Sequence, residues 1–372
     1  MKKTLIALAV AAASMATVAN AATVYQDDTS SLDVGGRVEV RGNVGDANKT
    51  QHDDSKYDDA SRVRLNLGGK QKYNDDVTFV GFTEYEVTED NAANGDDGNW
   101  NTRYLYAGAE TTWGNVYYGH QDTSWTYLTN WTDATENYAG DINEHLAATA
   151  DRADNVLRYA YMGERLTFQA HAQFNSTSDG SALTNYGSDS DNHDDNYESS
   201  TDAFGLMAAY KLTDSLEIGA GYAQADGGLN GDYAGDRGNP DNGDNYAYTA
   251  GIKYTNGGLW LATTYEGGRI SKSELDADES DFNAVDATVA YTFGSYTVDL
   301  TYNWFDADEN NDFFRQYNEE NINLGFKRQF TSNVTAFVVY RFNLLDDSDA
   351  QDGKAGERQQ DDEAMFGLRY AF

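Results

Sequence analysis

The segment YTVDLTYNW, residues 296–304, alternates apolar and polar side chains without interruption. Tyr296, Val298, Leu300, Tyr302 and Trp304 lie on one side of an extended chain, and the polar residues between them lie on the other. Because side chains two apart share a face of a strand, the segment predicts a β-strand with one apolar and one polar face. Residues 285–293 alternate in the same way. Only Gly294-Ser295 separates the two segments, which predicts a hairpin turn.

The same pattern recurs between Leu32 and Phe372 and predicts sixteen strands. Seven short connections, such as Gly163–Arg165, alternate strictly with eight long segments rich in Asp, Asn, Gly and Ser. One of the long segments separates the predicted strands Leu259–Glu266 and Phe282–Phe293. Short turns on one rim and long loops on the other are typical of outer-membrane barrels, whose long loops lie outside the cell.

The polar face of the strands carries Thr, Asn, Asp, Glu, Lys and Arg. Unpaired charges in the dry core of a soluble sandwich would cost several kcal/mol each, whereas a water-filled lumen removes that cost. Sixteen strands enclose a channel, while eight are filled by their own side chains. We therefore predict an all-β fold: a sixteen-stranded antiparallel transmembrane barrel with short periplasmic turns and long extracellular loops.

The first residues have the features of an export signal. Lys2 and Lys3 precede an apolar run from Leu5 to Val18, and Ala19-Asn20-Ala21 fits the small-x-small cleavage rule. The run is too short for a membrane-spanning helix, which needs about 20 apolar residues. We predict a signal peptide over residues 1–21 and a barrel over residues 22–372. Loss of the two lysines would change the formal net charge from −36 to −38.

Composition and motifs argue against catalysis. The chain has no cysteine, which excludes disulfide frameworks and thiolate metal sites. It has no HExxH, GxSxG, Walker or Rossmann motif, and its five histidines show no ligand spacing. We therefore expect no enzymatic activity, no cofactor, no metal site and no nucleic-acid partner. The 35 glycines, 27 tyrosines and single proline suit many antiparallel strands joined by tight turns.

Several fragments resemble the trimeric general-diffusion porins of enterobacteria and their marine relatives, in the same order along the chain. The fragments are LDVGGRVEV (Leu32–Val40), VRLNLGGKQKYNDDVTFVGFTEYE (Val63–Glu86), TRYLYAGAE (Thr102–Glu110), TDATENYAGD (Thr132–Asp141) and FGLRYAF (Phe366–Phe372). The resemblance implies a water-filled homotrimeric channel in the outer membrane of a Gram-negative bacterium. It also implies that Phe372 is the terminal aromatic residue read by the barrel-assembly machinery.

In that family, a basic wall faces carboxylates on a loop that folds into the channel. The resemblance implies that Arg37, Arg64, Arg103 and Arg152 form the wall, and Arg62 shares the strand face of Arg64. The inward loop is expected between His120 and Ala150. In it, Asp133 matches the first carboxylate of the family motif, whereas Glu136 falls one position before the second, where Asn137 stands. Asp141 and Glu144 are further candidates for the constriction.

The predicted external loops are strongly acidic. Ser176–Ala203 holds seven acidic residues and no Lys or Arg, and Phe342–Ala364 holds eight against two. Negative charge at a pore mouth concentrates cations, so we expect a cation preference in the passive diffusion of ions and small hydrophilic solutes. The other expected partners of the protein are outer-membrane lipid and lipopolysaccharide.

Two alternative functions stay open. One is an adhesin or phage-receptor barrel. The other is a solute-specific channel, for which Trp260 and Phe82 alone form too short an aromatic track.

Overall fold

In the computed structural model, one antiparallel β-sheet closes into a barrel, as the alternating pattern predicts. The structure describes residues 21–45, 56–88, 100–136, 138, 152–174, 202–226, 244–273, 276–307, 315, 318–346 and 360–372. The proposed signal peptide lies, apart from its last residue, outside the described residues and stays a prediction. Within the described ranges, no helix has the length and apolar character needed to cross a membrane.

The described chain contains eighteen strands, of which two are short and sixteen form the wall. The wall strands are β2 (Ser30–Gly45), β4 (Arg62–Lys72), β5 (Val77–Thr88), β6 (Asn101–Thr111), β7 (Gly114–Asp122), β8 (Arg152–Met162), β9 (Leu166–Gln173), β10 (Ala203–Lys211), β11 (Leu216–Asp226), β12 (Asp244–Asn256), β13 (Leu259–Ser273), β14 (Asp276–Phe293), β15 (Tyr296–Asp306), β16 (Glu319–Gln329), β17 (Val334–Asn343) and β18 (Glu363–Ala371). The short strands, β1 (Ala22–Gln26) and β3 (Tyr57–Asp59), pair with the two ends of β2. The predicted sixteen-stranded barrel is confirmed.

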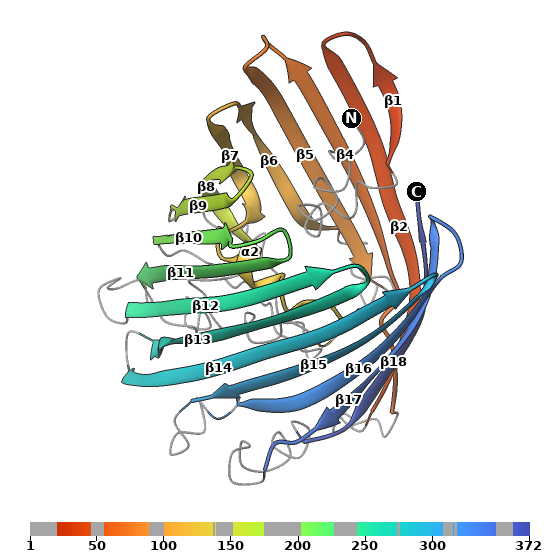
Figure 1. The fold of residues 1–372 in the computed structure, drawn as a ribbon, viewed down its shortest axis with the longest axis vertical. Helices are drawn as coiled ribbons and strands as arrows, with labels where there is room; N and C mark the ends of the chain where they lie inside the picture. Colours follow the sequence, from red (N-terminus) through yellow and green to blue (C-terminus); the bar gives the residue numbers. More distant parts are fainter. Residues whose placement is uncertain are drawn as a thin grey trace.

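The barrel closes where the last strand meets the first wall strand. β18 pairs with β2 from Glu363 opposite Gly45 to Ala371 opposite Arg37, and the two strands lie side by side in Figure 1. One residue further, the Gly36 and Phe372 backbones exchange hydrogen bonds of 2.9 and 3.0 Å. Closure gives the backbone groups of both strands partners, which a membrane-spanning sheet requires because lipid supplies none.

Side chains alternate between two environments along each wall strand. On β15, Val298 and Leu300 point outward and are 39% and 42% exposed, whereas Thr301 and Asn303 point inward and are 0% exposed. The outward face is the apolar one, as the sequence predicts, and it is the face that lipid would cover. The inward residues of β15 are fully buried because another segment of the chain covers them.

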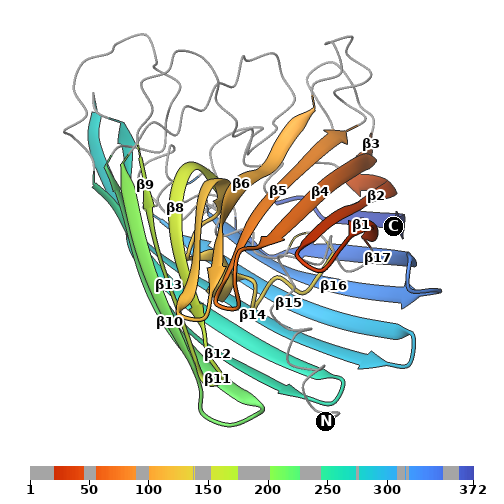
Figure 2. The same ribbon diagram turned by 90° about the horizontal axis from the view of Figure 1, so that it is seen from above.

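The short connections are tight hairpin turns. Gly257 and Gly294 have φ values of +61° and +59°, in the left-handed region that favours glycine. The predicted Gly294-Ser295 turn is therefore confirmed between β14 and β15. Figure 2 shows the turns that follow β10 and β12 at one rim of the barrel.

β13 and β14 differ from the prediction, because both are longer. The sequence predicts a long loop between Glu266 and Phe282, but the two strands continue and stay paired almost to the tip of their hairpin. Cross-strand ion pairs support the extension: Arg269 Nη1 lies 2.8 Å from Glu279 Oε2, and Arg269 Nε lies 3.0 Å from Asp281 Oδ1. The polar composition that suggested a loop therefore belongs to a paired hairpin.

Candidate functional site

The segment after β7 folds into the barrel and contains the short helix α2 (Thr126–Thr129) (Figure 1). Trp125 packs in an apolar cluster with Phe282 of β14 and Phe305 of β15. Leu128 and Trp131 pack in a second cluster with side chains of β10 and β13. All three anchors are at most 2% exposed. The segment is therefore packed against the inner wall, and this burial accounts for the buried inward face of β15.

This packing confirms the inward loop predicted between His120 and Ala150, as far as the loop is described. The loop begins at Thr123, because β7 continues through Asp122, which pairs with Arg152 of β8. Its described part covers residues 123–136 and 138. We call this part the inward segment.

Polar side chains of the wall hold the backbone of the inward segment. Thr288 Oγ1 donates a hydrogen bond of 2.6 Å to the Thr132 carbonyl, and Lys327 Nζ donates one of 2.7 Å to the Ala134 carbonyl. The Tyr138 carbonyl accepts from the Nδ2 atoms of two asparagines on β15 and β16, at 2.7 and 2.6 Å. These hydrogen bonds satisfy carbonyls that would otherwise be buried without partners.

Lys253 of β12 adds a charged anchor beneath α2. Its Nζ atom lies 2.9 Å from Glu217 Oε2 and 4.6 Å from the centroid of the Trp131 ring. The rings of Tyr127 and Trp260 lie 5.7 and 5.4 Å from the same nitrogen. A cation among three aromatic faces is stabilised by their quadrupoles, more strongly where water is excluded. This group ties the inward segment to β11, β12 and β13.

The predicted basic residues Arg62 and Arg64 of β4 and Arg103 of β6 gather on the inner wall, where glutamates of the same wall form ion pairs with them. Arg103 Nε lies 3.1 Å from Glu84 Oε1, and its Nη1 lies 3.4 Å from an oxygen of Glu86. Arg64 is paired with Glu86, and Arg62 Nε with Glu39 Oε1 at 2.8 Å. We call this arginine–glutamate group the paired wall.

The other two predicted basic residues occupy different places. Arg37 of β2 stands directly opposite Arg64 in the strand register, so it extends the paired wall. Arg152 lies at the start of β8, with its guanidinium 5.5 Å from the centroid of the Tyr104 ring. Tyr104 in turn donates a hydrogen bond of 2.7 Å to Asp122. Arg152 therefore belongs to the base of the inward segment.

The carboxylates predicted on the inward loop have different surroundings. Glu136 forms an ion pair with Arg369 of β18, and its Oε1 lies 3.8 Å from Lys327 Nζ, so it links the inward segment to the wall. Asp133 is exposed, on the part of the inward segment between α2 and Glu136. Asp141 and Glu144 lie outside the described residues.

The sequence analysis did not identify five charged residues that face the lumen beside the predicted ones: Glu39, Glu84, Glu86, Lys327 and Arg369. For most of them, the alternation of side chains along the strand already shows that the residue faces inward. Leu368 and Tyr370 are outward-facing, so Arg369 between them must face inward. The same argument applies to Glu84 and Glu86, which lie two residues apart on β5. The resemblance implies basic residues on the wall and carboxylates on the inward loop, so it does not indicate the glutamates of the wall.

Comparison with known proteins identifies this architecture. The model of the Gram-negative porin family matches residues 7–349. The chain belongs to that family. Outer membrane protein U of Vibrio parahaemolyticus is 34% identical, and Porin-like protein L of Photobacterium profundum is 35% identical, each over 100% of both chains.

Solved porins have the same fold. The structure of Salmonella typhi OmpF in complex with daunomycin superposes with a TM-score of 0.74, covering 94% of this chain and 100% of that one at 21% identity. The trimer form of Vibrio cholerae OmpT superposes with a TM-score of 0.66, covering 93% of this chain and 100% of that one at 16% identity. As a Gram-negative porin, the chain forms a diffusion channel in the outer membrane and is not an enzyme.

Proposed function

We propose that this porin prefers cations, and that its constriction lies between the paired wall and the inward segment. The wall side comprises Arg37, Arg62, Arg64 and Arg103 with their glutamates. The loop side comprises Asp133 and Glu136. Arg152 and Asp141 complete the predicted set, Arg152 at the base of the inward segment and Asp141 beyond its described part.

The observation that carries the proposal is the pairing within the wall. Glu39, Glu84 and Glu86 are at most 9% exposed, and their carboxylates are within ion-pair distance of Arg62, Arg64 and Arg103. These three glutamates reduce the positive field that isolated arginines would project into the lumen. Acidic residues also outnumber basic ones in the whole chain, whose formal net charge is −36. A negative potential in a narrow channel raises the local concentration of cations.

The test is the zero-current potential of single channels between unequal KCl concentrations. We expect the wild type to be cation-selective and Asp133→Asn to shift the potential toward anions. Two unit charges about 4 Å apart interact by about 4 kcal/mol at an effective dielectric constant of about 20, but by only about 1 kcal/mol in bulk water. A charge removed from the lumen should therefore affect selectivity more than one removed from the outer surface.

The matched control is Asp214→Asn, which removes the same charge from the exposed short turn between β10 and β11. We expect this variant to keep the wild-type zero-current potential, since salt screens charges beyond about 8–10 Å. An anion-selective wild type would contradict the proposed cation preference. Equal shifts in the two variants would place Asp133 away from the constriction.

We also propose that the protein assembles as a homotrimer. The support is the likeness to the Vibrio cholerae OmpT structure described as a trimer form. The unheated protein in mild detergent should have a protein mass about three times that of one chain, measured by light scattering with the detergent contribution subtracted. Heating should then release single chains on an electrophoresis gel. A scattering mass equal to one chain would rule out a stable trimer.

A further inference from the structure

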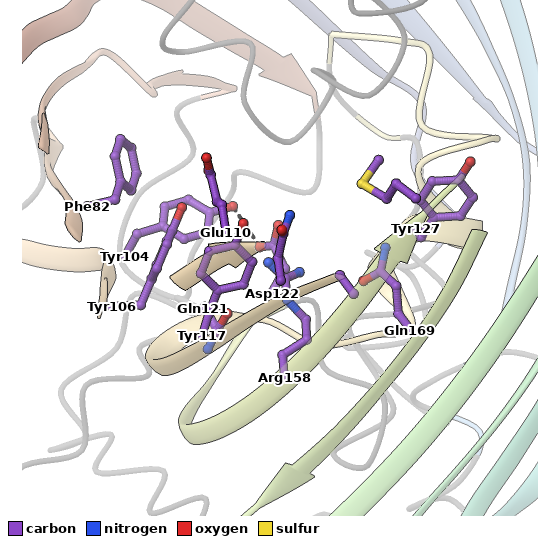
Figure 3. A pocket seen from close by; sticks show the side chains of 13 residues that line it. Phe82, Tyr104, Tyr106, Glu110, Tyr117, Gln121, Asp122, Tyr127, Arg158 and Gln169 are labelled. Atoms are coloured by element: carbon purple, nitrogen blue, oxygen red, sulfur yellow. Dashed lines mark hydrogen bonds between the residues drawn. The ribbon is translucent and has the colours of Figure 1, made fainter. Parts of the chain in front are cut away.

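A recess of about 160 Å³ lies on the inner face of the barrel, between strands β5 to β9 and the helix of the inward segment. Aromatic rings line much of it, as Figure 3 shows. Phe82, Tyr104, Tyr106 and Tyr117 come from three neighbouring strands, and Tyr127 comes from α2. The sequence suggested too few lumenal aromatic residues for a solute track, because it gave no reason to group these tyrosines.

The rings form a continuous cluster. The Phe82 centroid lies 5.9 Å from that of Tyr104 and 5.6 Å from that of Tyr106, and Tyr106 lies 5.5 Å from Tyr117. The guanidinium of Arg158 lies 5.5 Å from the centroid of the Tyr117 ring. Aromatic contacts at these distances stabilise one another and the guanidinium. The recess therefore offers a preformed apolar surface on the lumenal side of the wall.

Three buried polar atoms of the lining have no hydrogen-bond partner in the described part of the chain. They are Gln121 Oε1, Gln169 Oε1 and Arg158 Nε. Gln121 is 0% exposed and Gln169 is 6% exposed. Gln121 Nε2 donates a hydrogen bond of 2.9 Å to the Val156 carbonyl. Buried polar atoms in native proteins are nearly always paired with protein groups, water or a ligand, so these three leave hydrogen-bonding capacity in the recess that a bound ligand can use.

The chemistry of the three atoms defines that ligand. The two amide oxygens need hydrogen-bond donors, and the guanidinium N–H needs an acceptor. A carboxylate would satisfy only the guanidinium, and a cation only the amides, whereas hydroxyl groups both donate and accept. A ligand for the aromatic surface must in addition carry an apolar face.

We propose that the recess binds one ring of a neutral sugar as it passes through the channel. A pyranose presents apolar C–H groups on its faces, which would lie against the tyrosine rings. The hydroxyl groups on its edge would face Gln121, Gln169 and Arg158 and would pair with their buried polar atoms once these side chains turn toward the recess. This proposal rests on the chain forming an open channel and is independent of the proposed cation preference.

Glucose and sorbitol are the probes, because they carry the same number of carbons but only glucose closes into a ring. Single channels in a planar bilayer are titrated with each probe in KCl. We expect glucose to reduce the conductance with saturation and to add current noise. Sorbitol should reduce it only in proportion to the bulk conductivity of the solution.

Gln169→Leu should raise the half-saturating glucose concentration about two- to tenfold, the range expected for one lost hydrogen bond. Gln173→Leu is the matched control, since Gln173 lies on the same strand and the same face but outside the lining. Tyr106→Leu provides a second variant, which removes a ring and no buried amide, and it should also weaken the effect of glucose.

The outcomes separate the sugar site from the channel itself. A protein that conducts KCl but shows no saturable effect of glucose would overturn the sugar site and leave the channel intact. Equal effects of glucose and sorbitol would also overturn it, because the ring would then be irrelevant. Equal shifts in Gln169→Leu and Gln173→Leu would overturn the location. A protein that conducts no ions would instead contradict the channel.

Discussion

Leu300→Arg is expected to prevent most of the protein from folding into lipid vesicles. Leu300 lies near the middle of β15, is 42% exposed and points outward, where lipid would surround it. An arginine on the lipid face near the bilayer midplane costs roughly 2–4 kcal/mol. The measurement is the fraction of folded protein after dilution from urea into phosphatidylcholine vesicles, read from the mobility of unheated samples on an electrophoresis gel.

The control for this experiment is Thr297→Arg, on the inner face of the same strand near the short-turn rim. Thr297 is partly exposed, so an arginine there can extend into the lumen, and the folded fraction should equal that of the wild type. Alternation alone would suggest Thr301 as the control. Thr301 is fully buried and contacts Thr288, which holds the inward segment through Thr132. Equal losses in Leu300→Arg and Thr297→Arg would show that the outward and inward faces are wrongly assigned.

Trp131→Ala is expected to loosen the inward segment and to raise the single-channel conductance and its fluctuations. Trp131 is 2% exposed, packs beside Leu128 and contacts the ammonium of Lys253. Removing a buried tryptophan side chain costs about 3–5 kcal/mol. Trp131 belongs to the inward segment and not to a wall strand, so this free energy is lost from the contact between the inward segment and the wall. The barrel itself should stay folded.

Trp113→Ala is the control for the loss of a tryptophan. Trp113 lies in the short turn between β6 and β7 and is 68% exposed, so its removal leaves the inward segment unchanged. Conductance in this variant should match that of the wild type. If Trp131→Ala also conducts as the wild type does, the apolar cluster is not what holds the segment in place.

The fold could be predicted because a lumen and a bilayer impose opposite requirements on successive residues. Residues 296–304 show this in one strand, and the alternation of short and long connections shows it for the whole barrel. The largest error in the predicted strands was at the hairpin of β13 and β14. Beyond Glu266, β13 and β14 continue as a polar hairpin held by Arg269, and no apolar face marks it.

The site was harder to predict, because its contacts join strands that are distant in the sequence. Glu39 is paired with both Arg62 and Arg369, residues near opposite ends of the chain. Alternation shows that each of these side chains faces inward, but it does not show which of them meet. The aromatic recess could not be predicted for the same reason. Its tyrosines alternate like any others in the sequence, and they line one recess only because β5 to β9 are neighbours in the barrel.

The pairing of β18 with β2 constrains the order in which this protein can fold. Glu39 and Arg369 are separated by 330 residues, so their contact closes one of the largest loops available to the chain. Until β18 has paired with β2, the sheet has two open edges, and open edges recruit other strands. Contacts of such high sequence separation also form slowly. The unclosed chain must therefore be kept apart from its neighbours until β18 pairs with β2, because this one pairing removes both open edges.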